Sequence, residues 1–289
     1  MSVLRVENLK KTYRRHGTTV NALKGISFQI EPGSVTGFLG ANGAGKTTTI
    51  KCLLELAFAD EGQVFYFGKQ GLTNEAKARI GFLPERPYFY DYLTGREFLR
   101  FYGEISTKLS KKDLDIRITT LLKRVGLSHA SDRQLRSYSK GMLQRVGIAQ
   151  ALVHEPEFII LDEPMTGLDP DGRFEVRDII KETASRGTAV FFSSHLLPDA
   201  EKSCDRLVIL KLGQLVYQGP TSDLLAQTNA QFEFTWLENS ELKTEMIQTD
   251  QELQKRIDEA RSKSLSIVEI KPVRPTLEEA FVKIGFDKK

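Results

Sequence analysis

The chain has 289 residues, of which 41 are Lys or Arg and 38 are Asp or Glu, so its formal net charge is +3. Hydrophobic residues make up 40% of the chain and charged residues 27%, which is typical of a folded globular protein. Because positive and negative charges are nearly balanced, the net charge argues against nucleic acid as a partner. Two cysteines are too few for a disulfide framework. No apolar run reaches the roughly 18 to 20 residues that cross a bilayer, so we expect any role at a membrane to depend on a partner.

Strand-like and helical segments alternate along the first part of the chain, which indicates an α/β core. The stretch SVTGFLG (34–40) ends in a glycine turn and leads into the helical stretch KTTTIKCLLELA (46–57). Two further apolar runs, EFIILDEP (157–164) and TAVFFSSH (188–195), are typical of strands buried on both faces. The glycine-rich stretch GANGAGKT (40–47) lies between the first strand and the helix that follows it. Together with these segments it predicts a nucleotide-hydrolase core of the phosphate-loop type, with a mixed sheet flanked by helices.

The pattern becomes helical between residues 86 and 156. Thr94 and Glu97 form a capping box ahead of a helix. A later helix begins near Ser139 and stops before Pro156. We therefore expect a helical subdomain inserted between two halves of the core.

After residue 220 the sequence predicts a smaller α+β unit. The stretch QFEFTWL (231–237) alternates as a half-buried strand does, QELQKRIDEARSK (251–263) is typical of an exposed helix, and SLSIVEI (264–270) of another strand. Thr276 opens a final helix. The expected organisation is therefore, in chain order, 1–85 for the first part of the core, 86–156 for the inserted helical subdomain, 157–220 for the second part of the core and 221–289 for a C-terminal α+β extension.

The stretch GANGAGKT fits the phosphate-loop pattern G-x-x-x-x-G-K-[ST], with a strand before it and a helix after it. Its glycines let the backbone wrap phosphates, the Lys46 ammonium reaches the β- and γ-phosphates, and the Thr47 hydroxyl binds Mg²⁺. The residues expected to bind the nucleotide here are Gly40, Ala41, Asn42, Gly43, Ala44, Gly45, Lys46, Thr47 and Thr48.

Three further polar residues follow predicted core strands. Asp162 comes at the carboxyl end of FIIL, where ligands bind in α/β sheets, and its carboxylate is suited to Mg²⁺. Glu163 comes next, has no obvious ion-pair partner in the local sequence, and is placed to accept a proton from an attacking water. His195 ends another core strand, so its imidazole is expected to face the same crevice.

These residues, in this order and spacing, resemble the nucleotide-binding subunits of ATP-binding cassette (ABC) transporters, over roughly residues 3 to 220. The resemblance implies that Tyr13 stacks on adenine, that Glu163 is the catalytic base beside the catalytic Lys46, and that His195 is the switch histidine. It also makes Asp169, in the stretch GLDP, part of the loop that faces a partner subunit.

The stretch YSKGM (138–142) occupies the place of the signature that this family usually writes as L-S-G-G-Q. Ser139 and Gly141 match that signature, whereas the other three residues do not. The resemblance implies that this helix start binds the γ-phosphate held by a second protomer, in a head-to-tail dimer that encloses two ATP molecules. The alternative is that Ser139 only caps its helix.

A second departure from the family lies at Glu85, where many members carry a glutamine that contacts Mg²⁺. A carboxylate still coordinates the metal, but it adds negative charge beside the phosphates. The aromatic residues that follow, from Tyr88 to Tyr92, either pack internally or form a groove that receives a helix of a membrane partner.

The resemblance implies an ATPase that uses Mg²⁺ with ATP, pairs with a second ATPase subunit, expected to be another copy, and drives a separate transmembrane permease. YSKGM, the LPE stretch and the tail RPTLEEAFVKI resemble the single-domain ATPases of drug and polymer exporters. We expect a cytoplasmic protein, peripheral on the inner face of the cell membrane. An importer subunit, a soluble ABC-type ATPase acting on ribosomes or DNA, and a phosphate-loop kinase or GTPase are the alternatives.

Overall fold

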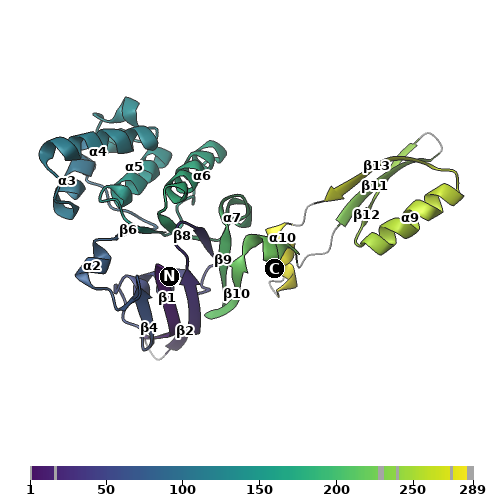
Figure 1. The fold of residues 1–289 in the computed structure, drawn as a ribbon, viewed down its shortest axis with the longest axis horizontal. Helices are drawn as coiled ribbons and strands as arrows, with labels where there is room; N and C mark the ends of the chain where they lie inside the picture. Colours follow the sequence, from purple (N-terminus) through teal and green to yellow (C-terminus); the bar gives the residue numbers. More distant parts are fainter. Residues whose placement is uncertain (1, 16–17, 227–230, 239–240, 274–275, 285–289) are drawn as a thin grey trace. The chain divides into compact units, whose positions relative to one another are not determined.

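The structure is a computed structural model that describes residues 2–15, 18–226, 231–238, 241–273 and 276–284. The chain divides into two compact units, Met1–Gly219 and Pro220–Lys289 (Figure 1). In the part of the chain that is described, no helix combines the length and the apolar character that a membrane span requires.

The centre of the first unit is a six-stranded sheet with the strand order β10-β9-β3-β8-β7-β6. Strand β3 runs parallel to β8 and β9, and β7 runs parallel to β6 and β8. Strands of a parallel sheet that is buried on both faces have continuous apolar sequences. The sequences of these strands are of that kind. The strands are β3 (Val35–Leu39), β6 (Ile80–Leu83), β7 (Phe158–Leu161), β8 (Ala189–Ser194), β9 (Arg206–Lys211) and β10 (Gln214–Pro220).

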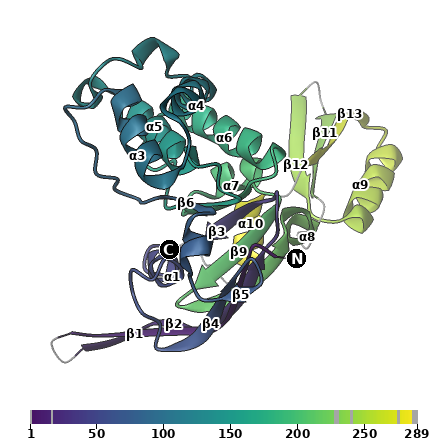
Figure 2. The same cartoon turned by 60° about the vertical axis from the view of Figure 1, so that its left-hand side comes forward.

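A second sheet of the same unit has four strands in the order β2-β1-β4-β5, and β1 pairs antiparallel with both β2 and β4. Strands β1 and β2 are the longest of the unit and lie side by side (Figure 2). This sheet carries Tyr13 on β1. The strands are β1 (Leu4–Arg15), β2 (Thr18–Ile30), β4 (Glu61–Tyr66) and β5 (Lys69–Gln70).

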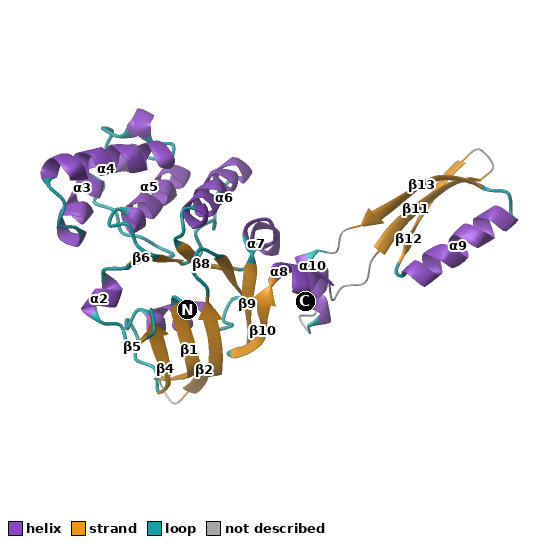
Figure 3. Cartoon of the chain, viewed as in Figure 1, coloured by secondary structure: helices purple, strands orange, loops and turns teal. Residues whose placement is uncertain are grey.

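Helices α5 and α6 pack against strands of the central sheet, and the three helices α3, α4 and α5 pack against one another (Figure 3). The capping box at Thr94 and Glu97 is present at the start of α3. The helices are α1 (Lys46–Leu53), α2 (Asn74–Lys77), α3 (Gly95–Ser106), α4 (Lys111–Arg124), α5 (Lys140–Leu152), α6 (Pro170–Ser185) and α7 (Leu197–Ser203), with 3-10 turns at Ser128–Ala130 and Leu135–Ser137.

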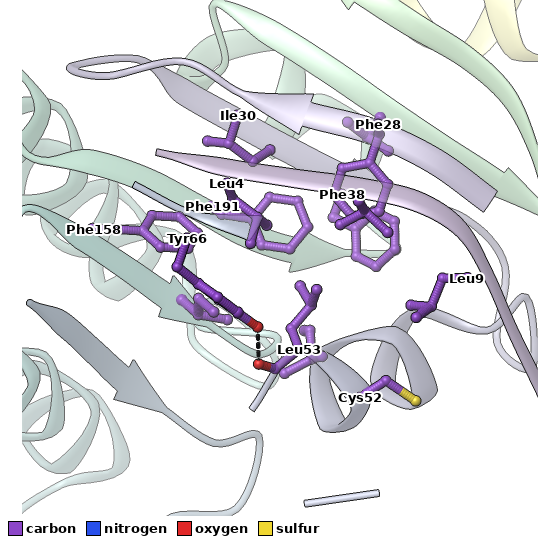
Figure 4. Packing of buried hydrophobic residues seen from close by; sticks show 14 of the residues in the cluster. Leu4, Leu9, Phe28, Ile30, Phe38, Cys52, Leu53, Tyr66, Phe158 and Phe191 are labelled. Carbon is purple, nitrogen blue, oxygen red and sulfur yellow. Dashed lines mark hydrogen bonds between the residues drawn. The ribbon is translucent and has the colours of Figure 1, made fainter. Parts of the chain in front are cut away.

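One aromatic core joins the two sheets to helix α1 (Figure 4). The Phe38 ring of β3 lies 5.9 Å from the Phe28 ring of β2 and 5.0 Å from the Phe191 ring of β8, measured between centroids. The Tyr66 hydroxyl donates a hydrogen bond to the backbone carbonyl of Leu53 at the end of α1. Burial of these rings therefore fixes α1 against both sheets, and with it the loop at the start of the helix.

The second unit holds a three-stranded sheet with the order β12-β11-β13, in which β11 pairs antiparallel with both neighbours. Phe234 and Trp236 of β11 are buried with Ile247 and Ala260, as the alternation in QFEFTWL predicts. The elements are α8 (Thr221–Ala226), β11 (Gln231–Glu238), β12 (Glu241–Ile247), α9 (Asp250–Ser262), β13 (Ser266–Val273) and α10 (Leu277–Lys283). The α/β class predicted from the sequence is confirmed.

Candidate nucleotide-binding site

The phosphate-loop segment connects strand β3 to helix α1. Helix α1 begins at Lys46, its N-cap is Gly45, and its first turn contains no acidic residue. Because Gly45 has no side chain, no side-chain acceptor caps the first N–H groups of α1. Those donors and the positive end of the helix dipole form a site suited to an anion.

Two glycines of this loop have conformations that other residues rarely adopt. Gly45 has φ +111°, and a Cβ there would lie 2.8 Å from the Ala22 carbonyl oxygen, so the loop packs tightly on β2. Gly43 has φ +80°, yet no atom of the described chain lies within 4 Å of a Cβ at that position. The backbone at Gly43 therefore borders open space, as close approach by a ligand requires.

Lys46 is buried, and its ammonium is held by oxygen atoms on both sides. Nζ donates to the Gly40 carbonyl at 2.7 Å and lies 3.5 Å from Oε1 of Glu163. A buried ammonium is stable only with such partners. The loop thus holds a positive charge at the start of α1.

Glu163 has both carboxylate oxygens engaged, although the sequence showed no local partner for it. Oε1 faces Lys46, while Oε2 accepts a hydrogen bond from the Thr166 hydroxyl at 2.9 Å and lies 2.8 Å from Nδ1 of His195. Its backbone has φ +50°, which is uncommon for a residue with a side chain. The strand end and the following turn therefore hold this carboxylate at one position beside the loop.

Asp162 lies behind Glu163 and is buried, with 4% of its surface exposed. The Ser193 hydroxyl donates to Oδ1 of Asp162 at 2.6 Å, and Oγ of Ser193 accepts the backbone N–H of Glu163 at 2.8 Å. Burial raises the pKa of the Asp162 carboxyl, the charges of Glu85 and Glu163 raise it further, and the Ser193 hydrogen bond opposes them. A buried carboxylate near the carboxylates of Glu85 and Glu163 favours the binding of a cation beside it.

The donor set fits Mg²⁺ because Thr47 and Glu85 line the cavity that adjoins Asp162. Mg²⁺ usually takes one or two carboxylates from the protein and completes its shell with water and substrate phosphates. The described residues include no group of three His, Cys, Asp or Glu that could hold a metal alone. The Thr47 hydroxyl and the carboxylates of Asp162 and Glu85 are therefore the groups of this chain that would hold the ion.

A cavity of about 760 Å³ brings most of the predicted residues together. Thr166, which the sequence did not single out, also lines it. The predicted residues that line it are Tyr13, Ala41, Asn42, Gly43, Gly45, Lys46, Thr47, Thr48, Glu85, Glu163 and His195. Gly40, Ala44 and Asp162 do not; Ala44 and Asp162 are buried, and the Gly40 carbonyl holds Lys46.

Tyr13 lies on β1, and 40% of its surface is exposed. The Lys11 ammonium lies 5.3 Å from the centroid of the Tyr13 ring. An exposed ring that lines a cavity is available for stacking on a planar base.

Ser139, Gly141 and Asp169 lie outside this cavity. Ser139 caps α5, because its Oγ accepts the Met142 N–H at 3.2 Å. A Cβ at Gly141 would meet no atom of the described chain closer than 4.0 Å. Asp169 caps α6 by accepting the Gly172 N–H at 3.0 Å.

The start of α5 lies beside the GLDP stretch of the same chain. A side chain on Gly167 would overlap the ammonium of Lys140, which is one of the residues that depart from the family signature. The Lys140 side chain therefore packs against this loop instead of extending over the helix start.

Ser193 is the second site residue that the sequence reasoning missed. Strands β7 and β8 are parallel and pair Leu161 with Phe192, so the next residues, Asp162 and Ser193, lie side by side. A prediction of that strand register would have found the pair.

Comparisons with known proteins identify the family of the chain. The ABC transporter family model matches residues 23–166. YhcH of Bacillus subtilis (strain 168), an uncharacterised ABC transporter ATP-binding protein, is 36% identical across 100% of this chain and 97% of its own length. The chain belongs to the ABC transporter family, among its ATP-binding proteins.

Two further relatives and one solved structure indicate what the chain is similar to. The ATP-binding protein sll0415 of Synechocystis sp., also uncharacterised, is 44% identical over a region that covers 78% of this chain and 64% of that protein. The bacitracin transport ATP-binding protein BcrA of Enterococcus faecalis is 38% identical over 80% of this chain and 74% of its own. The structure of cbiO1 from Clostridium perfringens has a TM-score of 0.69 at 30% identity, covering 78% of this chain and 91% of that one.

Proposed function

We propose that this protein hydrolyses ATP, works as a head-to-tail dimer with a second copy, and powers a separate transmembrane permease that exports its substrate. The observation that carries the proposal is the Glu163 carboxylate, held between Lys46, Thr166 and His195 at the wall of a cavity formed by the phosphate loop.

The loop and α1 bind the phosphates in this proposal. The backbone N–H groups of Gly43 to Thr48 and the Lys46 ammonium provide positive charge where the γ-phosphoryl oxygens gather charge during transfer. Tyr13 stacks on the base. Mg²⁺, held by Thr47 and Asp162 with Glu85 beside them, supplies charge neutralisation for the phosphates when bound.

Glu163 accepts the proton of the attacking water in this proposal. Its carboxylate is the one placed at the cavity wall, whereas Asp162 lies behind it with its Oδ1 bonded to Ser193. His195 and Thr166 orient the Glu163 carboxylate, and His195 also contacts the γ-phosphate. A general base contributes on the order of 100- to 10,000-fold to such a reaction.

Dimerisation completes the site. A side chain at Gly141 would meet no close neighbour among the described residues, so packing within that part of the chain does not require a glycine there. The Ser139 Oγ uses a lone pair on the Met142 N–H, which leaves its O–H free to donate to a phosphate of the other protomer. Asp169 and the GLDP stretch face that protomer in the proposed dimer.

Export through a permease is supported by similarity and by one surface. BcrA is named as a bacitracin transport protein, and cbiO1 is described as part of the ABC transporter complex cbiONQ. Tyr88 and Tyr92, which follow Glu85 in the sequence, are exposed aromatic residues, which suits them to receiving an apolar helix of the permease. The protein would then lie at the cytoplasmic face of the cell membrane.

The hydrolytic part is tested with the variant Glu163→Gln. We expect ATP binding to be retained and hydrolysis to fall by about 100-fold or more, because the amide does not accept the proton. Steady-state phosphate release measures this, with Glu104→Gln, an exposed glutamate of α3, as the matched control. Turnover equal to the control would remove Glu163 from the role of base.

The transport part is tested by purifying tagged Glu163→Gln protein from native membranes in the presence of ATP. A polytopic membrane protein in stoichiometric amount is the expected companion, and its identity indicates the cargo. Recovery with ribosomes or DNA alone would keep the ATPase chemistry and refute the permease.

A further inference from the structure

A second cavity, of about 440 Å³, lies in the first unit and shares no residue with the nucleotide cavity. It is formed by helix α4, by the segment between α5 and β7, and by the end of α6 with the turn that follows. Three arginines line it: Arg117 and Arg124 from α4 and Arg186 after α6. Its volume is in the range of small-molecule sites.

Two of the three arginines lie deeper in this cavity than the anionic groups, whereas the Arg186 side chain is 58% exposed. The Arg117 and Arg124 side chains are 20% and 18% exposed, whereas the Glu155 and Glu157 side chains are 73% and 56% exposed. The carboxylates therefore lie at the rim, in contact with water. Water screens the rim charges more strongly than the inner ones, so the interior of the cavity is electropositive.

The ion pairs around the cavity leave one guanidinium in excess. Glu157 is bound by Arg79 through two hydrogen bonds of 2.6 and 2.7 Å, and Arg117 pairs with Glu155. The remaining carboxylate, that of Glu182, is shared by two arginines.

Of those two arginines, Arg186 has the better contact with Glu182. Its Nη2 lies 2.7 Å from Oε1, whereas the Arg124 Nε lies 3.4 Å from the same oxygen without hydrogen-bond geometry. Among the described residues the buried Nε of Arg124 has no hydrogen-bond partner, and its Nη2 donates to the Thr183 hydroxyl at 3.4 Å. Burial lowers the pKa of Arg124, the Glu182 carboxylate opposes this shift, and the nearby Arg186 and Arg117 charges lower the pKa further.

A buried guanidinium without full partners is unfavourable, and a planar donor of this kind matches the oxygens of phosphate. We propose that this cavity binds a small phosphate-bearing anion, held by Arg124 and Arg117. The anion would also join α4 to the end of α6, because the two arginines and Thr183 belong to those elements. This site is independent of the proposed ATPase function.

The test uses the full chain carrying Lys46→Ala, so that the phosphate loop does not contribute to binding. Isothermal titration calorimetry with inorganic phosphate, at constant ionic strength set with chloride, measures the affinity. We expect saturable binding at one site per chain. Adding Arg124→Met weakens the binding by about ten-fold or more, since bonds to charged groups are worth about 1.5 to 3 kcal/mol.

Arg117→Met is the second variant, in case loss of Arg124 prevents folding, and it is expected to weaken binding in the same way. Arg100→Met is the matched control, because Arg100 forms an exposed pair with Asp115 outside the cavity. Glycerol 3-phosphate, run in parallel, distinguishes an esterified phosphate from the free ion as the better ligand. Absence of saturable binding, or equal affinity in the control and both cavity variants, would overturn the proposal.

Discussion

One hydroxyl group connects the two adjacent acidic residues of the site. Ser193 is fully buried, donates to the Asp162 carboxylate and accepts the backbone N–H of Glu163. It therefore orients the carboxylate proposed to bind the metal and fixes the backbone that carries the proposed base. A buried donor and acceptor left without partners each cost about 1 to 3 kcal/mol.

Replacing Ser193 with Ala removes both of these hydrogen bonds. We expect kcat for ATP hydrolysis to fall by roughly 10- to 100-fold, taking about 1.4 kcal/mol per factor of ten, and the Mg²⁺ concentration for half-maximal activity to rise. Ser193→Thr keeps the hydroxyl and is expected to retain most of the activity. If Ser193→Ala hydrolyses ATP with unchanged Mg²⁺ dependence, Ser193 has no positioning role.

His154 makes the stability of the first unit depend on pH. Its Nε2–H donates to the Ile80 carbonyl at 3.1 Å, and burial lowers the pKa of the imidazole below its ordinary value of 6.5. Below that pH the unfolded chain binds a proton more readily than the folded chain does. The free energy of unfolding therefore decreases as pH falls from 6.5 toward the lower pKa of His154 in the folded state, by up to about 1.4 kcal/mol per pH unit.

Thermal unfolding at pH 7.5 and pH 5.5 measures this effect, with His154→Gln as the comparison. The wild-type midpoint is expected to fall more between the two pH values than that of His154→Gln, since glutamine does not titrate. Equal falls in the two proteins would show that His154 does not contribute.

At the scale of elements, the start of helix α5 has two tasks in this account. Ser139 caps the helix, which is worth about 1 kcal/mol of stability, so its replacement does not separate capping from binding to a partner. Gly141 does separate them, because a side chain there meets open space within the chain.

Gly141→Val is expected to leave the unfolding midpoint and ATP binding unchanged and to reduce hydrolysis by about ten-fold or more, because the added side chain blocks approach of the partner's phosphate. Calorimetric ATP binding and phosphate release are measured on the same preparation. Hydrolysis at the wild-type rate would leave capping as the only role of this helix start.

Elements with strong local signals were predictable from the sequence, and long-range contacts were not. The phosphate loop has its glycines and lysine within one short stretch, and the capping box at Thr94 and the start of the final helix at Thr276 occur as predicted. The four-stranded sheet was not predicted, because β1 pairs with β2 and with the distant β4. The ion pair of Glu163 with Lys46 was missed for the same reason, since only the parallel register of the central sheet brings the two segments together.

At the scale of the whole molecule, the site of one chain is incomplete in this account. Lys46, Glu163 and His195 come together in the nucleotide cavity, whereas Ser139 and Gly141 lie outside it. Two copies in head-to-tail order would place the helix start of each over the nucleotide of the other. Binding of ATP should therefore drive association, and hydrolysis should reverse it.

The measurement that tests this most directly is the mass of Glu163→Gln protein in solution, by light scattering after gel filtration, with ATP and Mg²⁺ and again with ADP. The account predicts a dimer, twice the 32.6 kDa chain mass, with ATP and a monomer with ADP. Adding Gly141→Val is expected to abolish the dimer. A monomer under both conditions, with ATP binding demonstrated, would contradict the account.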